Sequence, residues 1–322
     1  MSNHPDSHTI ESALRMAVRA PSVHNTQPWL WRVGESTLHL YADETRRLPY
    51  ADPDGRNLTI SCGAALHHLR VGAQVLGWDT HVHRLPNPAE PAHLASIEFH
   101  RATPTDESIR LARAINERRS DRRRFTSWKV TAGHIDALVE AGRSNGVLVH
   151  DVDSGYERAG LLRAFEIASR AHARDFDYTA ELHEWSGHHA APQGVPARSA
   201  VSSTDATVRP FADPGLGQAV IDDIDGEDTM LVLSTSGDER ISQLRAGEAA
   251  SAVLLTATAM GLATCLLTEP LELADTRAAV RAEVLHDSGF PQVIIRAGWA
   301  ASSADAIPAT PRLPLDEVVQ PL

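Results

Sequence analysis

Residues 63–77 read GAALHHLRVGAQVLG, and residues 247–261 read GEAASAVLLTATAMG. Both stretches run fourteen positions from glycine to glycine, and in both a proline follows nine positions later, at Pro86 and Pro270. Two alanine-rich helices can match by coincidence, but a spacing that continues past the helix favours an internal duplication. Glycine and alanine on both helices allow their backbones to approach closely, so we expect the two helices to pair at the centre of the molecule.

Composition and charge exclude several classes of protein. The 322 residues suggest two ordinary domains or one large one, and the 42% of hydrophobic residues can build a core. The net charge of −12 argues against a nucleic-acid partner. The chain has neither a secretory signal pattern nor an uninterrupted apolar run of membrane-spanning length, and its two cysteines, Cys62 and Cys265, lie far apart. We therefore expect a soluble protein of the reducing cytoplasm, with no membrane partner.

Hydrophobic spacing predicts a mixture of helices and strands. The expected helices cover residues 10–18, 58–76, 108–115, 154–174, 243–260 and 276–286, with further helices after Thr131 and before Trp185. The expected strands cover residues 29–33, 37–41, 94–100, 146–152, 230–235, 265–267 and 293–296. The order does not follow a strict βαβ rhythm, so the pattern favours the α+β class.

Residues 187–228 interrupt this pattern with glycines, prolines and small polar residues but no periodicity. A long irregular segment inside a compact chain is typically a functional lid or a disordered stretch. Without apolar periodicity we expect the segment to lie on the surface as a lid. The entropy of loop closure changes slowly with length, so shortening the lid over residues 196–212 is expected to leave stability nearly unchanged.

Residues 118–125 read RRSDRRRF and place five arginines within seven positions of an acidic chain. Such a run can be a solvated charged face. Alternatively, it forms an anion site, because guanidinium groups and a serine hydroxyl both donate hydrogen bonds to phosphate.

Residues 21–29 read PSVHNTQPW and place polar side chains in a turn between an expected helix and an expected strand. They can be an ordinary helix terminator with turn residues. Neither this stretch nor the arginine run identifies a function by itself.

Together the two motifs resemble the FMN-dependent nitroreductase family. The matching features are Arg118, Ser120 and Arg122; the nonapeptide 21–29; Gly261-Leu262 followed by residues 265–268; and residues 312–314, which read RLP. The resemblance implies a nitroreductase-like fold and an FMN cofactor. It also implies NAD(P)H as reductant and a small-molecule electron acceptor, such as a nitroaromatic compound or a quinone.

The resemblance also implies which residues hold the cofactor. They are Ser22, Val23, His24, Asn25, Gln27, Arg118, Arg119, Ser120, Arg122, Leu266, Leu267, Thr268 and Arg312. Arg122 is expected near N1 and O2 of the flavin, where positive charge stabilises the anionic reduced form. The flavin itself carries the redox chemistry, so no catalytic side chain is expected. No set of cysteine, histidine and carboxylate residues has metal-binding spacing, so no metal is expected.

The order of the motifs departs from the simple family pattern, because the nonapeptide precedes the arginine motif by about ninety residues. Nitroreductases are homodimers with FMN at the interface. One chain with one copy of each motif therefore resembles a fused dimer with one site lost, as in the Acg-like mycobacterial branch. This layout implies a monomeric pseudo-dimer with halves 1–104 and 105–322 and one FMN per chain. A rival hypothesis is a non-catalytic protein that sequesters FMN beneath the lid and needs no acceptor.

Overall fold

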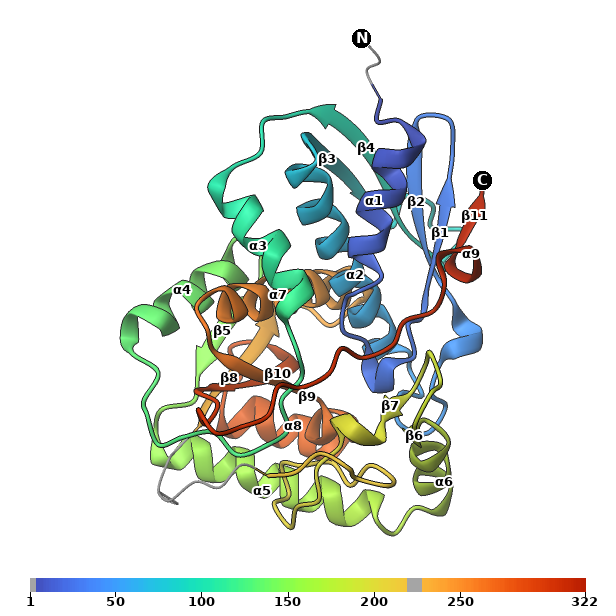
Figure 1. Cartoon of the computed structure of the whole chain (residues 1–322). Coiled ribbons are helices and arrows are strands. Elements are labelled where there is room, and N and C mark those ends of the chain that lie inside the picture. The colour runs from blue at the N-terminus through green and yellow to red at the C-terminus, as the bar shows by residue number, and fades with distance from the viewer. Residues whose placement is uncertain (1–3, 219–227) are drawn as a thin grey trace.

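We describe a computed structural model that places residues 4–218 and 228–322 (Figure 1). Within these residues, two larger sheets, one two-stranded sheet and a set of helices confirm the α+β class. The first sheet has the order β11-β1-β2-β4-β3, and the second has the order β5-β8-β10-β9. The strands of the first sheet are β1 (Trp29–Val33), β2 (Thr37–Ala42), β3 (Trp78–Arg84), β4 (His93–Arg101) and β11 (Val319–Pro321). Those of the second are β5 (Leu148–Asp151), β8 (Thr229–Thr235), β9 (Ala263–Leu267) and β10 (Phe290–Gly298).

The helices surround and separate these sheets. They are α1 (Ser7–Ala17), α2 (Arg56–Val75), α3 (Asp106–Glu117), α4 (Ala132–Arg143), α5 (Gly155–His172), α6 (Phe176–Glu184), α7 (Arg240–Ala259), α8 (Ala274–Glu283) and α9 (Leu315–Val318). None of the helices in the described residues is long and apolar enough to cross a membrane.

The two sheets share one strand order. If β1, β2, β4 and β3 are matched with β5, β8, β10 and β9, every neighbouring pair is antiparallel in both sheets. Helix α2 follows the second strand of its set, and α7 does the same in the other set. The C-terminal strand β11 returns to the first sheet and pairs in parallel with β1. Equal order is expected of a duplicated unit, but the duplication and the boundary at residue 104 stay predictions.

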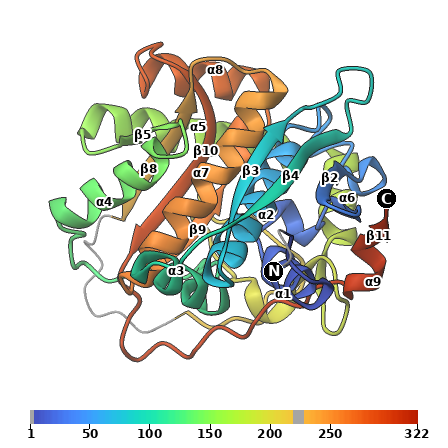
Figure 2. The same cartoon turned by 90° about the horizontal axis from the view of Figure 1, so that it is seen from above.

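Helices α2 and α7 form the predicted central pair. Figure 2 shows them side by side, with the second sheet beyond α7 and strands β3 and β4 beyond α2. Gly63 and Gly247 meet at the crossing: a Cβ atom added at Gly63 would lie 2.1 Å from the Leu244 carbonyl oxygen. One added at Gly247 would lie 1.9 Å from the carbonyl oxygen of Ile60. Both helices are buried along most of their length, including the polar residues Asn57 and Ser61 of α2 and the charged Glu248 of α7.

Of the strands in the two larger sheets, β3 and β11 were not predicted from the sequence, and both lie at an edge of the first sheet. In β3 every residue after Trp78 is at least partly exposed, and the polar residues Asp79 and His81 are exposed. It therefore lacks the hydrophobic alternation of a half-buried strand. Strand β11 is short and pairs with a partner nearly three hundred residues away, at Trp31–Val33.

The prediction of an irregular surface lid is wrong in part. Among its described residues, β6 (Ser186–His188) pairs with β7 (Val195–Pro196), and a 3₁₀ turn covers Ala197–Ser199. The lid residues Val195, Ala200 and Phe211 are buried. They pack in one cluster with Leu48, Ala51, Tyr178 and Leu182. Single apolar residues without periodicity thus build a small core, so removing residues 196–212 is now expected to destabilise the fold. Residues 219–227 of the predicted lid lie outside the described residues.

The helix crossing generates a stability prediction. We expect Gly63→Ala to lower the free energy of unfolding by about 2–3 kcal/mol, because the new methyl group overlaps a backbone oxygen that cannot rotate away. The matched control is Gly133→Ala in α4, where a Cβ atom meets nothing within 4 Å. The control is expected to be neutral or to stabilise the helix by up to about 1 kcal/mol. Urea unfolding measures both, and equal midpoints would contradict close backbone packing at Gly63.

Candidate functional site

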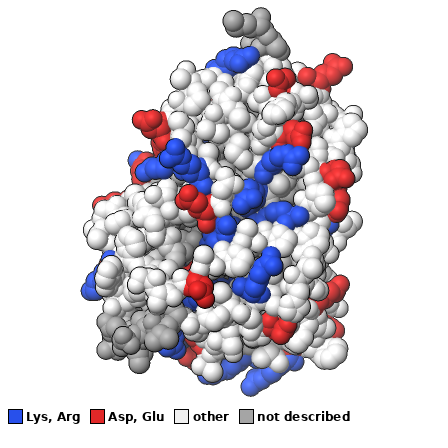
Figure 3. Space-filling view, viewed as in Figure 1, with Lys and Arg blue, Asp and Glu red and all other residues white. Residues whose placement is uncertain are grey.

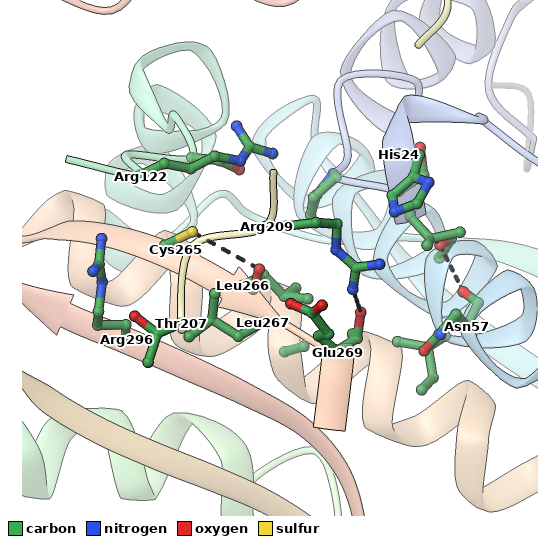
Figure 4. Close-up of a pocket in the computed structure, with 18 of the residues that line it drawn as sticks. His24, Asn57, Arg122, Thr207, Arg209, Cys265, Leu266, Leu267, Glu269 and Arg296 are labelled. Atoms are coloured by element: carbon green, nitrogen blue, oxygen red, sulfur yellow. Dashed lines mark hydrogen bonds between the residues drawn. The ribbon is translucent and has the colours of Figure 1, made fainter. Parts of the chain in front are cut away.

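A cavity lies where segments distant in sequence converge (Figure 4). The N-terminal half of α2 and residue Ala250 of α7 form one part of its lining, so the cavity adjoins the helix crossing. Strand β9 and the residues that follow it form a second part. The turn before β1, the arginine segment and the lid complete it; the residues that they contribute are Pro21–His24, Ser120, Arg122, Thr207–Arg209 and Phe211.

The arginine segment is held against the edge of the second sheet. Ser120 forms a parallel bridge with Thr264, and the backbone N–H of Asp121 donates to the carbonyl oxygen of Thr264 at 2.8 Å. The Asp121 carboxylate accepts two hydrogen bonds from the Arg123 guanidinium at 2.9 and 2.8 Å, and both side chains are buried. This ion pair fixes the loop, so that Ser120 and Arg122 both line the cavity next to β9.

The turn before β1 has an unusual backbone. His24, Asn25 and Gln27 adopt φ values of 43°, 57° and 52°, in the left-handed region that non-glycine residues occupy rarely. Side-chain hydrogen bonds hold the turn: Ser22 Oγ accepts from the backbone N–H of Gln27 at 2.9 Å. The backbone N–H of Val23 donates to Ser61 Oγ at 3.0 Å. Such local strain is typical of functional sites.

A second, smaller cavity adjoins the first and is rich in arginine. Its lining shares Ser22, His24, Ser120 and Arg122 with the larger cavity and adds Asn25, Arg118, Ser199 and Arg312. Figure 3 shows basic side chains gathered in the middle of one face of the molecule. Arg312 donates to the backbone carbonyl oxygens of Val18, Arg19 and Ala20, at 2.9, 3.0 and 3.0 Å.

Arg118 is buried, yet its side chain forms no hydrogen bond or ion pair within the described part of the chain, and its Nε is orphaned. Burial, together with the nearby Arg119 and Arg19, lowers the pKa of Arg118 to about 10. Burial and the positive charge of Arg118 lower the pKa of Arg312 to about 9. A buried cation without a counter-ion is costly, so the small cavity is suited to an anion that accepts hydrogen bonds.

Other buried polar atoms in these cavities also lack hydrogen-bond partners among the described residues. They are both ring nitrogens of His24, Asn57 Oδ1, Ser199 Oγ and Arg296 Nε. Burial holds the pKa of His24 well below its usual value, so its imidazole is neutral. Leaving a buried polar group unpaired costs about 1–3 kcal/mol, so the cavity is prepared for a ligand with many polar atoms.

The lid forms one wall of the larger cavity and is fastened to both halves of the chain. Phe211 packs edge-to-face on His24 at 5.5 Å, and the Arg122 guanidinium lies 4.9 Å from the centre of the Phe211 ring. The buried Arg209 donates to both carboxylate oxygens of Glu272, at 3.0 and 2.6 Å, and to the Tyr178 hydroxyl. The lid is therefore latched to the residues that follow β9.

The nonapeptide turn fastens the lid on the opposite side. Asn25 Nδ2 donates to the carbonyl oxygen of Gly194 at 3.1 Å, and Gln27 Nε2 donates to that of Pro192 at 2.9 Å. The Gln27 Oε1 also accepts from the backbone N–H of Leu313 at 2.9 Å. Gln27 thus connects the turn with both the lid and the C-terminal segment.

Most of the residues predicted from the sequence come together at these two cavities. Ser22, Val23, His24, Asn25, Arg118, Ser120, Arg122, Leu266, Leu267, Thr268 and Arg312 line one or both. Two predicted residues line neither cavity. Arg119 donates to the carbonyl oxygens of Ile307 and Asn116, and Gln27 has the connecting role described above.

Several lining residues were not predicted. Asn57 and Ser61 lie four positions apart on the buried helix α2, so their polar character inside an apolar helix was a signal in the sequence. Arg209, Phe211, Glu269 and Arg296 belong to no motif of the sequence. No group of three or more potential metal ligands is arranged to hold a metal ion in the described residues.

Comparison with known proteins gives consistent matches. The sequence model of the nitroreductase family matches residues 115–299. The chain is 46% identical over 321 residues to "Putative NAD(P)H nitroreductase Rv3131" of Mycobacterium tuberculosis (strain ATCC 25618 / H37Rv), covering 98% of this chain and 92% of that protein. It is 39% identical over 320 residues to "Putative NAD(P)H nitroreductase acg" of the same strain, covering 96% and 94%.

Solved structures of similar proteins are more distant. One is the FMN and NADPH-dependent nitroreductase NfnB from "sphigopyxis sp. strain HMH", with a TM-score of 0.41 and 20% identity. The match covers 65% of this chain and 97% of that one. Another is a nitroreductase with bound FMN from Bacteroides fragilis NCTC 9343, with a TM-score of 0.40, 15% identity, and coverage of 61% and 90%.

The lid latch generates the second prediction. We expect Arg209→Met to lower the free energy of unfolding by about 3–5 kcal/mol, because it leaves the buried Glu272 carboxylate without its cation. The double variant Arg209→Met/Glu272→Leu should recover much of this loss in a urea double-mutant cycle. As a control, Arg163→Met breaks an exposed pair with Glu283 and should cost at most about 1 kcal/mol. Equal losses for Arg163→Met and Arg209→Met would show that the latch stabilises no more than a surface pair.

Proposed function

This chain belongs to the nitroreductase family, and we propose that it is a flavoprotein that binds FMN and transfers electrons from NAD(P)H to a small-molecule acceptor. Nitroaromatic compounds and quinones are the proposed acceptors. The observation that carries the proposal is the buried, unpartnered Arg118 at the end of a cavity whose other buried polar atoms also lack partners. The names of the relatives, which include NAD(P)H, support the choice of reductant.

The residues at the cavities fit the parts of FMN. Arg118 and Arg312 offer charge to the phosphate, and Ser120 offers a hydroxyl. The neutral His24 and the amide of Asn57 can bond the polar edge of the flavin or the ribityl hydroxyls, while Leu266 and Phe211 offer apolar surface to the ring. When bound, FMN supplies two-electron chemistry, accepting a hydride equivalent from nicotinamide and returning electrons to an acceptor. The protein contributes binding, orientation and electrostatics.

We infer one FMN per chain because a buried ion cluster occupies the equivalent place in the other half. When the sequences of the two repeats are aligned with Gly63 on Gly247, Ala64 falls on Glu248, and Ala64 lines the cavity. Matching Gly77 with Gly261 aligns the cavity residue Thr268 with Arg84.

Glu248 and Arg84 fill this second place together with Arg70. The Glu248 side chain is 1% exposed and accepts from Arg84 at 2.6 and 2.8 Å and from Arg70 at 2.8 Å. Arg70 also donates to Asn145 at 3.3 Å. Both arginines here are bonded to the buried Glu248 carboxylate, which occupies the place of an anion, and this supports the proposed pseudo-dimer with one working site. The α2–α7 contact within the chain likewise supports the proposed monomer.

A second candidate function is storage of FMN without turnover. The observation that favours it is the lid, which contributes Thr207, Arg209 and Phe211 to the cavity wall and is latched through Arg209 and Asn25. A lid that stays closed over the flavin would exclude both nicotinamide and acceptor.

Anaerobic mixing separates the two functions. If the protein is a reductase, the visible flavin absorbance of the purified holoprotein should bleach within seconds of adding NADPH or NADH, because hydride transfer destroys the oxidised chromophore. Stopped-flow absorbance provides the measurement. Persistent yellow colour with both nucleotides, together with bleaching by dithionite, would reject the reductase and support storage.

Arg118 provides the third prediction, which tests the site itself. Titration calorimetry of the apoprotein with FMN should give a stoichiometry near one, and Arg118→Met should weaken binding by about 2–5 kcal/mol through loss of a desolvated charge pair. Riboflavin lacks the phosphate, so its affinity should hardly change. The control variant is Arg113→Met, which alters an exposed arginine of the neighbouring helix α3. A stoichiometry of two, or equal weakening of FMN and riboflavin binding, would refute the assigned phosphate site.

A further inference from the structure

We propose that Glu269 is the proton donor to the electron acceptor in this cavity and that His172 resupplies its proton; the proposal rests on the proposed reductase function. Reduction of a quinone by NAD(P)H consumes one proton from solution, because the nicotinamide delivers a hydride and the product carries two new O–H bonds. Reduction of a nitro group to a nitroso group with loss of water consumes one proton as well. An enclosed site therefore needs a group that can carry this proton to the acceptor.

Glu269 has the required position. It lies in the 3₁₀ turn Glu269–Leu271 directly after β9, is 4% exposed and lines the cavity. Figure 4 shows it next to Arg209 and below His24, on the inner side of the lid. A carboxyl group at this place can reach a molecule held between β9 and the lid.

His172 makes Glu269 a proton carrier rather than an isolated carboxylate. His172, the last residue of α5, is also buried, and its Nδ1 lies 3.4 Å from Glu269 Oε1. Its ring is stacked on Tyr178, with 3.9 Å between ring centroids and 4° between ring planes, which fixes the imidazole orientation. Because an imidazole can both accept and donate a proton, His172 is assigned the exchange of a proton between water and the carboxylate.

The other carboxylates near the lid are committed to structural bonds. Glu272 accepts from Arg209 and from the Thr268 hydroxyl, and Glu181 accepts from the backbone N–H groups of Tyr50 and Ala51. Glu269 has a single side-chain hydrogen bond within the described part of the chain, and its partner is itself titratable. Glu269 alone of these three lines the cavity.

The charges around the pair come from several elements. Arg209 of the lid, with Glu272 and Tyr178, faces Glu269, and His24 of the turn faces His172. The Arg209–Glu272 ion pair is close to neutral as a unit.

The proton transfer is balanced as follows. The acceptor oxygen forms a bond to the proton while the O–H bond of the Glu269 carboxyl group breaks, and the electron pair of that bond stays on the carboxylate. The electrons that reduce the acceptor come from NAD(P)H. His172 then passes the proton on its Nδ1 to the carboxylate and recovers one from water.

Separate half-reactions test this assignment in the holoprotein. Reduction by NADPH delivers a hydride and needs no proton from Glu269, so Glu269→Gln should change its rate less than threefold. Oxidation of the reduced protein by menadione needs the proton and should slow by about 100-fold or more. In the wild type this rate should fall as pH rises, because the donor must be protonated. In Glu269→Gln it should be low and independent of pH.

Two further variants distinguish proton supply from a structural role. The His172→Asn variant keeps a hydrogen-bond donor next to Glu269, but this amide cannot gain or lose a proton. The variant should therefore shift the pH profile of the menadione reaction. The matched control is Glu157→Gln, because Glu157 also accepts from two histidines, His150 and His286, at 3.1 and 2.9 Å, but does not line the cavity. The control should leave both half-reactions unchanged. Equal slowing of both half-reactions in Glu269→Gln, or an unaltered pH profile, would overturn the proposal.

A readout without turnover accompanies the kinetics. Glu269→Gln should move the imidazole NMR signals of His172 in the holoprotein, because the group next to its Nδ1 changes from a carboxylate to an amide. Unchanged imidazole signals would mean that the two groups are not in contact, and the proposal would fail.

Failure of the proposed function gives a different result. If NADPH does not reduce the holoprotein, dithionite can reduce it, and the menadione reaction still tests Glu269. In that case the reductase proposal fails while the proton assignment stands or falls by the pH profile. A dithionite-reduced protein that menadione does not oxidise at any pH would overturn the assignment as well.

Discussion

The close approach of α2 and α7 at Gly63 and Gly247 is the constraint on which the rest of the structure depends. Side chains at these two positions would separate the helices, and each helix carries one sheet on its other side. The same crossing positions the cavity, because Ile60, whose carbonyl oxygen meets Gly247, and Ala250 both line it. The width of the binding site is thus set by a backbone contact in the core, away from the loops that carry most of the polar groups.

Buried charge divides the arginines of the described chain into two groups. Arg84, Arg123 and Arg209 are matched with carboxylates and stabilise contacts between segments distant in the chain or within the arginine loop. Arg118 and Arg312 have no carboxylate partner among the described residues, and burial lowers the pKa of both. Arg56 is also buried without a carboxylate partner, but it donates to the carbonyl oxygens of Gln292 and Leu271. The Arg118 side chain has no hydrogen-bond partner among the described residues, so its burial is a stronger argument for an anion site than the arginine run alone.

The sequence predicted those parts of the molecule whose signal is local. The central helices follow from their glycine and alanine content, and the two motifs predicted a site because their polar residues are contiguous. The ion pair between Arg84 and Glu248 could not be predicted, since it joins an edge strand without clear alternation to a helix residue 164 positions away. The same holds for Glu269 and His172, which are 97 positions apart and become neighbours only when α5 packs on the turn after β9. The burial of the lid was missed because Val195, Ala200 and Phe211 are single apolar residues that follow no helix or strand periodicity.

The lid is held in place by a small core and by two sets of hydrogen bonds. Phe211 belongs to a small core and also covers the cavity, so the lid cannot swing away as a rigid flap without exposing apolar surface. The latches at Arg209 and at Asn25 lie on opposite sides, so a nicotinamide ring could enter by releasing one while the other held the segment. Releasing Arg209 would leave the Glu272 carboxylate without its counter-ion unless the carboxylate took up a proton. Glu269 and His172 are the neighbouring groups that can exchange protons there. The cavity floor and the lid therefore meet in one cluster of charged groups, Arg209, Glu272, Glu269 and His172. For either proposed function, opening the lid at this side would have to disrupt that cluster.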